Sequence, residues 1–378
     1  MNKLISDEFK LRKDVIYLNH AGVSPWPLRT LNAVQEFADE NMVQGSLRYP
    51  EWLEVETGLR NRAQQLINAP SPLDIALLKN TSEALSVVAY GLEWKNGDNI
   101  VSCNQEFPSN RIVWESLAQK GVEFREADFT KAGNPEDALF ALVDNNTRLI
   151  TISSVQFSTG LKMDLQRIGE FCKKRGILFC VDAIQSLGAM QFDVQQIQAD
   201  FVMADGHKWM LGPEGLAVFY SAPDARDHLH LNQYGWHMVE AAGDFDRRDW
   251  GIAKSARRFE CGSPNMLGIY ALNASLSLLL DVGMDHVEKE ILSRSEYLFD
   301  KIKTRPELEL ITSTSQGRYA GIVTFRRTGI DSALLYQHLM QKKVVCAHRS
   351  RGIRLSPHFY TPYEQLDHVI DLIMRYTP

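Results

Sequence analysis

Four short runs of apolar and β-branched residues recur along the middle of the chain, and helical patterns separate them. The runs read NIVSCN, RLITISSV, ILFCVDA and FVMADG. Between the second and third runs, Asp164 is placed to cap a helix with one apolar face, and Gly176 is placed to end it. Strand, helix, strand is the arrangement of a parallel sheet covered on both faces. The alternation therefore predicts an α/β fold with a mainly parallel sheet sandwiched by helices.

The pattern changes near residue 265, which divides the chain of 378 residues into two predicted domains. Residues 15–264 form the predicted large α/β domain. Residues 265–378 open with a long helical pattern and form a smaller C-terminal α+β domain. Residues 1–14 are expected to pack on either of them. A chain of this length is long enough to bury a large core.

Composition and spacing limit the partners and the compartment. A net charge of −6 without a basic stripe gives no reason to expect nucleic acid. No segment approaches the roughly 18 uninterrupted apolar residues that a membrane span needs. The five cysteines are scattered without a CxxC pair and the N-terminus is too polar for a signal peptide, so we expect a cytoplasmic protein. His228, His230 and His237 lack a second ligand cluster at metal spacing, and no metal site is predicted.

Charged side chains stand where two neighbouring predicted strands end. Asp182 ends the run ILFCVDA, and the next run delivers Asp205, His207 and Lys208. Open α/β sheets bind ligands beyond the carboxyl ends of their strands, so these groups are expected to meet. One interpretation is a salt bridge between strand ends. The other is a cofactor site in which Lys208 forms an imine with an aldehyde and Asp182 keeps a ring nitrogen protonated, which makes the ring an electron sink.

The aldehyde cofactor with such a ring, pyridoxal 5'-phosphate, also needs a phosphate site, and residues 78–94 supply a candidate. Asn80 and Glu83 have the spacing of a capping box, while Thr81 and Ser82 offer hydroxyls and backbone N–H groups. The apolar helix pattern that follows would place a phosphate at a helix N-terminus, where N–H groups and the helix dipole favour negative charge. A well-capped helix without a ligand is the alternative.

Six motifs follow one another along the chain: NTSEA, EFPSN, VDAIQSLG, DGHKWMLGPEG, RRFECGSPN and GIRLSPHFY. In this order they resemble the class V aminotransferase superfamily of fold-type I pyridoxal phosphate enzymes. The resemblance covers nearly the whole chain, from YLNHAG at residue 17 to the last predicted helix. This superfamily includes cysteine desulfurases, selenocysteine lyases, kynureninase and isopenicillin N epimerase. The resemblance implies a homodimer with shared active sites that acts on a small amino acid.

The resemblance also implies roles for single residues. Lys208 is similar to the Schiff-base lysine, and Asp182 to the carboxylate on the pyridine nitrogen. Further cofactor contacts are implied for Thr81, Ser82 and His207 at the phosphate, Gln185 and Gln156 near the ring hydroxyl, Phe107 on the ring face, and Ser263 at the phosphate of the neighbouring subunit. Asp205 stands where relatives often use a serine or threonine for the phosphate. Because a carboxylate would repel the dianion, no role is assigned to it.

Two residues are assigned to the substrate. Arg354 matches the arginine that holds an amino acid's carboxylate, a task that suits a planar guanidinium. A surface arginine on a strand is the alternative. His20 in LNHAG is assigned to the entrance, with a core histidine as the alternative. His348 and Arg349 are expected either to approach the substrate or to lie in a solvated loop.

The reaction is left open by the motifs, and transamination is favoured. A cysteine desulfurase needs a mobile thiolate, and the candidate Cys346 ends an apolar strand-like run shortly before Arg354. Phe107 and Pro108 also replace the His-His pair that is common in desulfurases. Cysteine desulfuration or elimination at a carbon–sulfur bond is the alternative. The remote alternative is a catalytically silent relative that acts as a binding protein.

Overall fold

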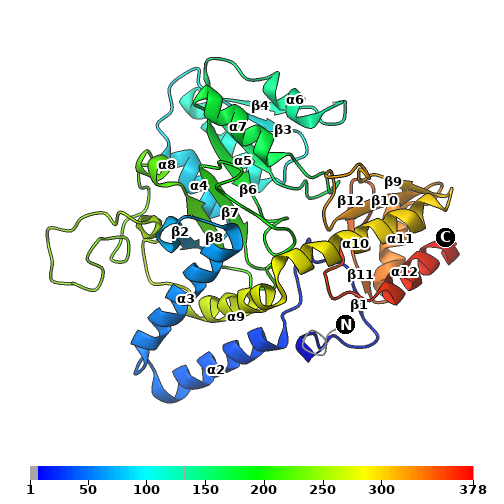
Figure 1. Cartoon of the computed structure of the whole chain (residues 1–378), viewed down its shortest axis with the longest axis horizontal. Helices are drawn as coiled ribbons and strands as arrows, with labels where there is room; N and C mark the ends of the chain where they lie inside the picture. Colours follow the sequence, from blue (N-terminus) through cyan, green and yellow to red (C-terminus); the bar gives the residue numbers. More distant parts are fainter. Residues whose placement is uncertain (1–6, 132, 378) are drawn as a thin grey trace.

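A seven-stranded sheet forms the centre of the computed structural model, which describes residues 7–131 and 133–377 (Figure 1). The strand order is β2-β8-β7-β6-β5-β3-β4. β8 is antiparallel to both of its neighbours, and the other neighbouring pairs are parallel. The strands are β2 (Ile75–Leu78), β3 (Asn99–Cys103), β4 (Glu123–Ala127), β5 (Thr147–Ser153), β6 (Leu178–Asp182), β7 (Phe201–Asp205) and β8 (Ala217–Ser221). The predicted mainly parallel sheet is confirmed.

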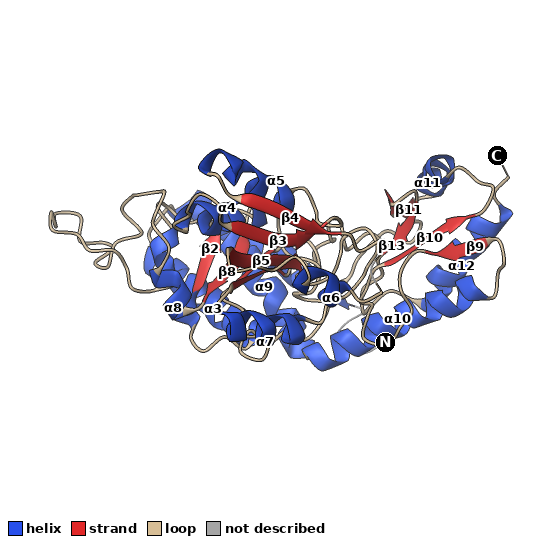
Figure 2. Cartoon of the chain, turned by 90° about the horizontal axis from the view of Figure 1, so that it is seen from above, coloured by secondary structure: helices blue, strands red, loops and turns tan. Residues whose placement is uncertain are grey.

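Helices cover both faces of this sheet (Figure 2). Successive side chains of a strand point to opposite faces, so Val181 of β6 lies in one hydrophobic core and Cys180 in the other. The first core is completed by α3 (Tyr49–Ile67), α7 (Leu165–Arg175) and α9 (Met266–Val282), and the second by α4 (Thr81–Gly91), α5 (Ser109–Glu115) and α8 (Pro223–Asp227). The remaining helical segments here are α2 (Leu28–Gln44), α6 (Pro135–Phe140), η1 (Pro72–Asp74), η2 (Ser116–Lys120) and η3 (Ala256–Phe259).

The helix predicted between Asp164 and Gly176 is confirmed as α7. The Asp164 carboxylate accepts a hydrogen bond from the Arg167 N–H at 3.1 Å, which satisfies a free donor of the first turn. Gly176 ends the helix with a φ of 66°, a left-handed conformation that glycine adopts without strain. Local sequence signals are enough to set both ends of this helix.

The C-terminal part is built on a smaller antiparallel sheet of order β12-β13-β10-β9. Its elements are β9 (Leu308–Leu310), β10 (Val323–Arg327), β12 (Ala347–Arg349), β13 (Gly352–Leu355), α10 (Met284–Lys303), α11 (Ser332–Gln341) and α12 (Tyr363–Arg375). β1 (Ile16–Tyr17), near the N-terminus, pairs in parallel with β11 (Val344–Val345). A strand near the N-terminus thus pairs with a strand of the C-terminal part.

Two elements pack across the predicted domain boundaries. α9 lies beyond residue 264, yet Ile269 and Leu272 are buried in the core of the large sheet, and the helix packs on α2 and α3. At the other end, β1 and Leu18 pack with the C-terminal part, although residue 15 was the predicted start of the large domain. A helix as apolar as α9 must be covered, and the large sheet and its helices cover it.

Within the described residues, no single helix is both long and apolar enough to cross a membrane. α9 and α10 reach that length and composition only as a pair, and the pair is bent by 83°.

Candidate active site

The carboxyl ends of β6 and β7 open into a cavity of about 430 Å³. Asp182 is the last residue of β6 and Asp205 the last of β7, and Lys208 follows three positions later. The predicted residues that line the cavity are Thr81, Ser82, Phe107, Asp182, Gln185, His207, Lys208 and Arg354. The structure therefore brings most of the predicted site together at the sheet edge where α/β folds bind ligands.

Lys208 and Asp182 are the charged pair at the floor of this cavity. Burial lowers the pKa of Lys208 from its ordinary value, and the nearby Asp182 carboxylate partly offsets that effect. Burial raises the pKa of Asp182, against one hydrogen bond from the Ile184 N–H at 3.1 Å. The Lys208 ammonium lies 5.6 Å from the centre of the Phe107 ring. A lysine with a lowered pKa is readily available as a neutral amine, the form that attacks an aldehyde.

The N-terminus of α4 forms a polar wall of the same cavity. The Asn80 side chain accepts a hydrogen bond from the Glu83 N–H at 2.8 Å, which confirms the predicted cap. Glu83 reaches the Lys79 N–H at 2.6 Å rather than that of Asn80. Thr81 Oγ1 accepts from the Asp205 N–H at 3.1 Å, which ties this helix to the end of β7. Backbone N–H groups at such a terminus attract anions.

Several buried polar atoms around the cavity have no hydrogen-bond partner within the described chain. They are Asp205 Oδ1, His207 Nδ1 and Arg354 Nε. Buried polar atoms are normally paired, so a cluster of orphans indicates room for a polar ligand. With the hydroxyls of Thr81 and Ser82 and the carboxylate of Asp182, these groups fit a phosphorylated pyridine aldehyde.

Arg354 reaches the cavity from β13 of the smaller sheet. Only 2% of its surface is exposed, so the alternative of a surface arginine is wrong. Its Nη1 donates to the Phe157 carbonyl at 2.7 Å and its Nη2 to Asn19 Oδ1 at 3.1 Å. Burial lowers the pKa of Arg354 to about 9. A guanidinium held in this way presents a fixed cation to a carboxylate in the cavity.

Three predicted residues lie outside the cavity. His20 is fully buried, and its ring nitrogens contact the Ser356 carbonyl at 2.8 Å and the Tyr360 hydroxyl at 2.7 Å. We therefore correct its assignment to the substrate entrance: it is a core histidine. Gln156 is buried behind the wall, and Ser263 is exposed and does not line this cavity.

Two carboxylates that sequence reasoning did not use belong to this region. Asp205 lines the cavity. Glu106 is buried behind it, where it accepts hydrogen bonds from the Ser153 N–H at 2.7 Å and from Gln156 Nε2 and Asn110 Nδ2 at 3.0 Å each. Burial raises the pKa of Glu106. Glu106 follows the end of strand β3 by three residues, and this position of a carboxylate could have indicated it from the sequence.

Cys346 is not placed to act as a thiolate in the cavity. Its side chain is buried between β11 and β12, and burial raises its pKa to about 12. Only Ser350 and Arg351 join β12 to β13, both with left-handed φ values of 50° and 56°. Among the residues that the structure describes, no cysteine lines the cavity.

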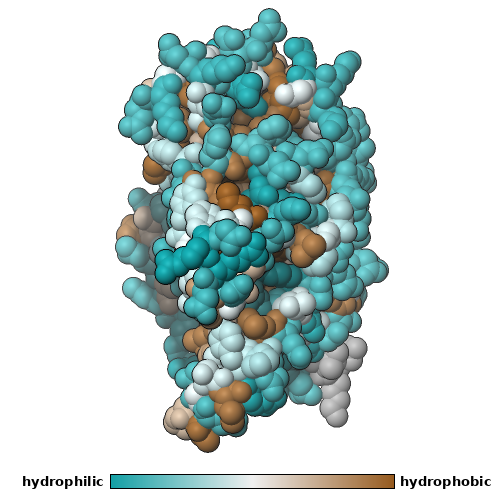
Figure 3. Space-filling view, turned by 90° about the vertical axis from the view of Figure 1, so that its left-hand side faces the viewer, coloured by the Kyte–Doolittle hydropathy of each residue, from teal (hydrophilic) through white to brown (hydrophobic). Residues whose placement is uncertain are grey.

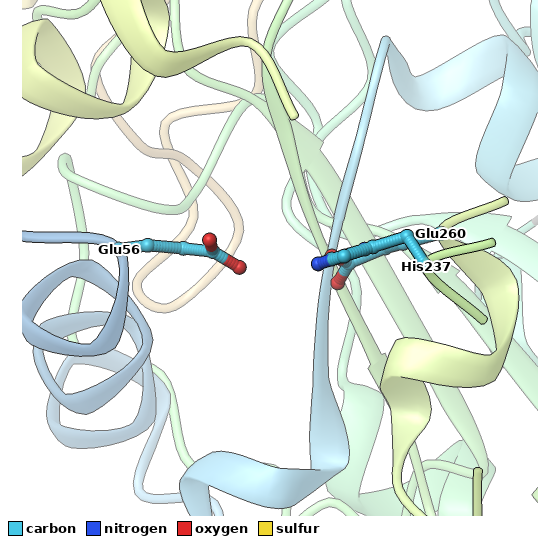
Figure 4. Close-up of side chains that lie close together, drawn as sticks. All are labelled: Glu56, His237 and Glu260. Carbon is cyan, nitrogen blue, oxygen red and sulfur yellow. The ribbon is translucent and has the colours of Figure 1, made fainter. Parts of the chain in front are cut away.

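Glu56, His237 and Glu260 form a separate buried cluster (Figure 4), and none of them lines the cavity. A metal ion could use these ligand types, but Arg60 already pairs with both carboxylates and contacts Glu260 through two nitrogens at 2.6 and 2.7 Å. Glu260 also accepts from the Leu77 N–H at 2.8 Å. The cluster is an ion-pair network that joins α3 to β2, and we assign no metal to it.

The fold and the cavity together define a pyridoxal-phosphate-dependent enzyme, with a lysine and a carboxylate at neighbouring strand ends beside a helix N-terminus. More narrowly, the chain belongs to the class-V aminotransferase family, whose sequence profile matches residues 16–367. The resemblance drawn from the six motifs is thereby confirmed.

Relatives within this family carry different names. A probable cysteine desulfurase of Methanothermobacter thermautotrophicus is 30% identical over 95% of this chain and 94% of that protein. An uncharacterized aminotransferase of Bacillus subtilis is also 30% identical, over 91% of this chain and 90% of that protein.

Solved structures agree with the fold. The apo cysteine desulfurase of Thermococcus onnurineus has a TM-score of 0.88 at 23% identity, covering 99% of this chain and 97% of that chain. The cystine C–S lyase C-DES, in complex with its product cysteine persulfide, has a TM-score of 0.89 at 22% identity, covering 97% and 99%. At these identities the likeness establishes the fold, and the reaction has to be argued from the site.

Proposed function

We propose that the protein cleaves a carbon–sulfur bond of a small sulfur-containing amino acid by elimination at the β-carbon, without a thiol of its own. The observation that carries this proposal is a cavity that combines Lys208, Asp182 and Arg354 but is lined by no cysteine of the described chain. The names of the relatives, which point to cysteine and cystine chemistry, support the substrate class.

The roles of the residues follow from their positions. Arg354 binds the substrate's carboxylate and so fixes the amino acid over the floor of the cavity. Lys208, with its lowered pKa, removes the proton from the α-carbon and can return one to the leaving sulfur. The electron pair released at the α-carbon expels sulfur with the electrons of the carbon–sulfur bond. Bound pyridoxal phosphate supplies the electron sink for this chemistry, held by Asp182 at its ring nitrogen and by Thr81, Ser82 and His207 at its phosphate.

Transamination, which the sequence favoured, is the second candidate. It uses the same lysine and arginine, and the Bacillus subtilis relative is named as an aminotransferase. We rank it below elimination because the other relatives and structures named above concern sulfur amino acids.

The products distinguish the reactions. Purified holoenzyme given cystine or cysteine should release pyruvate and a sulfur product at equal rates, without an added 2-oxo acid. The Cys346→Ser variant should keep most of this activity. Alanine formed from cysteine and lost in Cys346→Ser would instead establish a desulfurase, and turnover that requires a 2-oxo acid would establish a transaminase. Borohydride reduction followed by peptide mapping should place the cofactor on Lys208.

We also propose that the active unit is a cytoplasmic homodimer. Ser263 is exposed, as expected for a residue that reaches the phosphate site of a second copy. Residues 232–252 form a loop at the left of Figure 1 that exposes aromatic side chains, among them Tyr234, Phe245 and Trp250. Figure 3 views the side of the molecule from which this loop extends and shows apolar residues set among hydrophilic ones. Such side chains suit burial against a partner subunit.

A further inference from the structure

A carboxylate lies in the cradle that we assign to the cofactor's phosphate. Asp205 lines the cavity together with Thr81, Ser82 and His207. Its backbone N–H donates to Thr81 Oγ1 at 3.1 Å, which brings it to the N-terminus of α4. An ionised carboxylate repels a phosphate dianion at such close range, so the pair requires a compensating cation or a proton.

His207 is not that cation. Its Nδ1 lies 3.8 Å from Asp205 Oδ2, beyond a hydrogen bond, and burial lowers the pKa of His207 to about 4. In the cofactor-free protein the imidazole is therefore mainly neutral at physiological pH, and its Nδ1 has no partner within the described chain. It can share one hydrogen bond with the phosphate, and it makes no hydrogen bond to the carboxylate.

The other charged groups around Asp205 have their own tasks or the wrong sign, except Arg349, which lines the cavity but is not among the charges that shift the pKa of Asp205. Lys208 is the proposed imine lysine, Arg354 is the proposed carboxylate site, and Glu83 caps its own helix through Lys79. The charged groups near Asp205 come from several elements. They are Glu83 on α4, Asp182 on β6, Lys208 and Glu214 after β7, Arg349 on β12 and Arg354 on β13. Burial is the main cause that raises the pKa of Asp205 and Glu214 adds to it, whereas the Thr81 backbone N–H and Lys208 lower it.

One oxygen of the Asp205 carboxyl group is left free for a ligand in the cavity. Oδ1 is buried without a partner. A carboxyl group that carries a proton offers one O–H donor, whereas a carboxylate only accepts. Burial already raises the pKa of Asp205 to about 6, and a phosphate dianion beside it would raise that pKa again.

We propose that Asp205 binds the cofactor's phosphate as a neutral carboxyl group whose O–H donates to a phosphate oxygen. One proton then enters the site from solvent with each cofactor, and the cofactor's affinity falls as the pH rises. The inference rests on the proposed place of the phosphate at α4. It does not depend on the reaction that the holoenzyme catalyses.

The test counts protons during binding, without substrate. Full-length apo-protein carrying Lys208→Ala, which removes imine formation, is titrated with pyridoxal phosphate by isothermal calorimetry. Buffers with different ionisation enthalpies give the number of protons taken up. At pH 8 we expect Lys208→Ala to take up about one proton per cofactor more than Lys208→Ala/Asp205→Asn. The dissociation constant of the first protein should rise roughly tenfold per pH unit above pH 7, and that of the second by less than about threefold.

Each result decides the proposal. Equal proton counts in the two proteins would overturn it. Weaker binding by the Asp205→Asn protein at pH 8 would also overturn it, because the carboxylate would then act in its ionised form. If the asparagine variant does not fold, Asp205→Ser in the same background is judged by the same count. Pyridoxal, which lacks the phosphate, should give the same proton count in both proteins.

Discussion

Burial of Lys208 favours its neutral amine form and lowers the free energy of unfolding of the apo-protein at neutral pH. Burial lowers its pKa, so the folded apo-protein holds the lysine's proton less tightly than the unfolded chain does. Stability contributed by this residue therefore rises with pH between the lowered pKa and the ordinary value near 10.4.

Because the buried lysine destabilises the folded state while it is protonated, we expect the Lys208→Met apo-protein to be more stable than the wild type at pH 7. The expected gain in the free energy of unfolding is on the order of 1 to 3 kcal/mol. Asp182 then takes up a proton, which its raised pKa permits. The advantage should shrink as the pH rises toward about 10.4 and beyond, where the unfolded chain's lysine also loses its proton. Urea unfolding at pH 7 and pH 10 measures it, and an equal advantage at both values would contradict the assignment.

Arg354 illustrates why the shape of a cation matters. Its guanidinium is fixed by Phe157 and Asn19 and leaves Nε for another partner. We predict that Arg354→Lys raises the substrate's KM about tenfold or more with a smaller effect on kcat, because a point charge cannot reproduce the planar fork. Steady-state kinetics on the eliminated substrate test this. A fall in kcat alone would place the carboxylate elsewhere.

At the scale of elements, the loop after β6 must pass very close to the lysine segment. Gly188 has a φ of 88°, and a Cβ there would lie 2.3 Å from the backbone oxygen of Trp209, the residue after Lys208. Two backbone segments cannot move apart as a flexible side chain can, so this contact requires glycine.

We expect Gly188→Ala to destabilise the protein by on the order of 2 to 4 kcal/mol. Gly176→Ala is the matched control, since Gly176 also has a left-handed φ, of 66°, but nothing lies within 4 Å of its Cβ position. That variant should lose only about 1 kcal/mol. Denaturant unfolding compares the two, and equal losses would mean that the close approach to Trp209 is not the cause.

For the whole molecule, the cavity lies where the two sheets meet. Lys208 comes from the large sheet and Arg354 from the small one, and Ala21 to Val23 line the cavity from the N-terminal segment. A change in how the parts pack would therefore move the substrate's carboxylate relative to the lysine, and catalysis is sensitive to about 1 Å of such displacement.

The proposed dimer predicts that inactive subunits can complement each other. Lys208→Ala should be inactive, and Ser263→Asp should bind the cofactor poorly by repelling the partner's phosphate. A mixed dimer of the two would contain one site with both defects and one intact site. Differently tagged subunits allow its purification, and about half of the wild-type activity per dimer is expected. No recovered activity would show that Ser263 does not serve the partner's site.

The order of helices and strands and the charged residues at the strand ends can be predicted from the sequence, because both depend on residues that are close together along the chain. The cap at Asp164, the end at Gly176 and the N-terminus of α4 involve residues a few positions apart. Asp182 and Lys208 are identifiable because each follows a recognisable apolar strand, and the order of six motifs adds the family.

Only the tertiary structure decides what a residue meets across the fold. His20 contacts Ser356, which is 336 positions away, and is buried there rather than at the entrance. α9 belongs to the large core because α2 and α3 cover it, although the sequence pattern assigns it to the second domain. Asp205 is held beside the N-terminus of α4, the proposed phosphate site, by its hydrogen bond to Thr81, 124 positions earlier. Burial and charge at such sites arise from contacts between distant segments, and no local pattern encodes them.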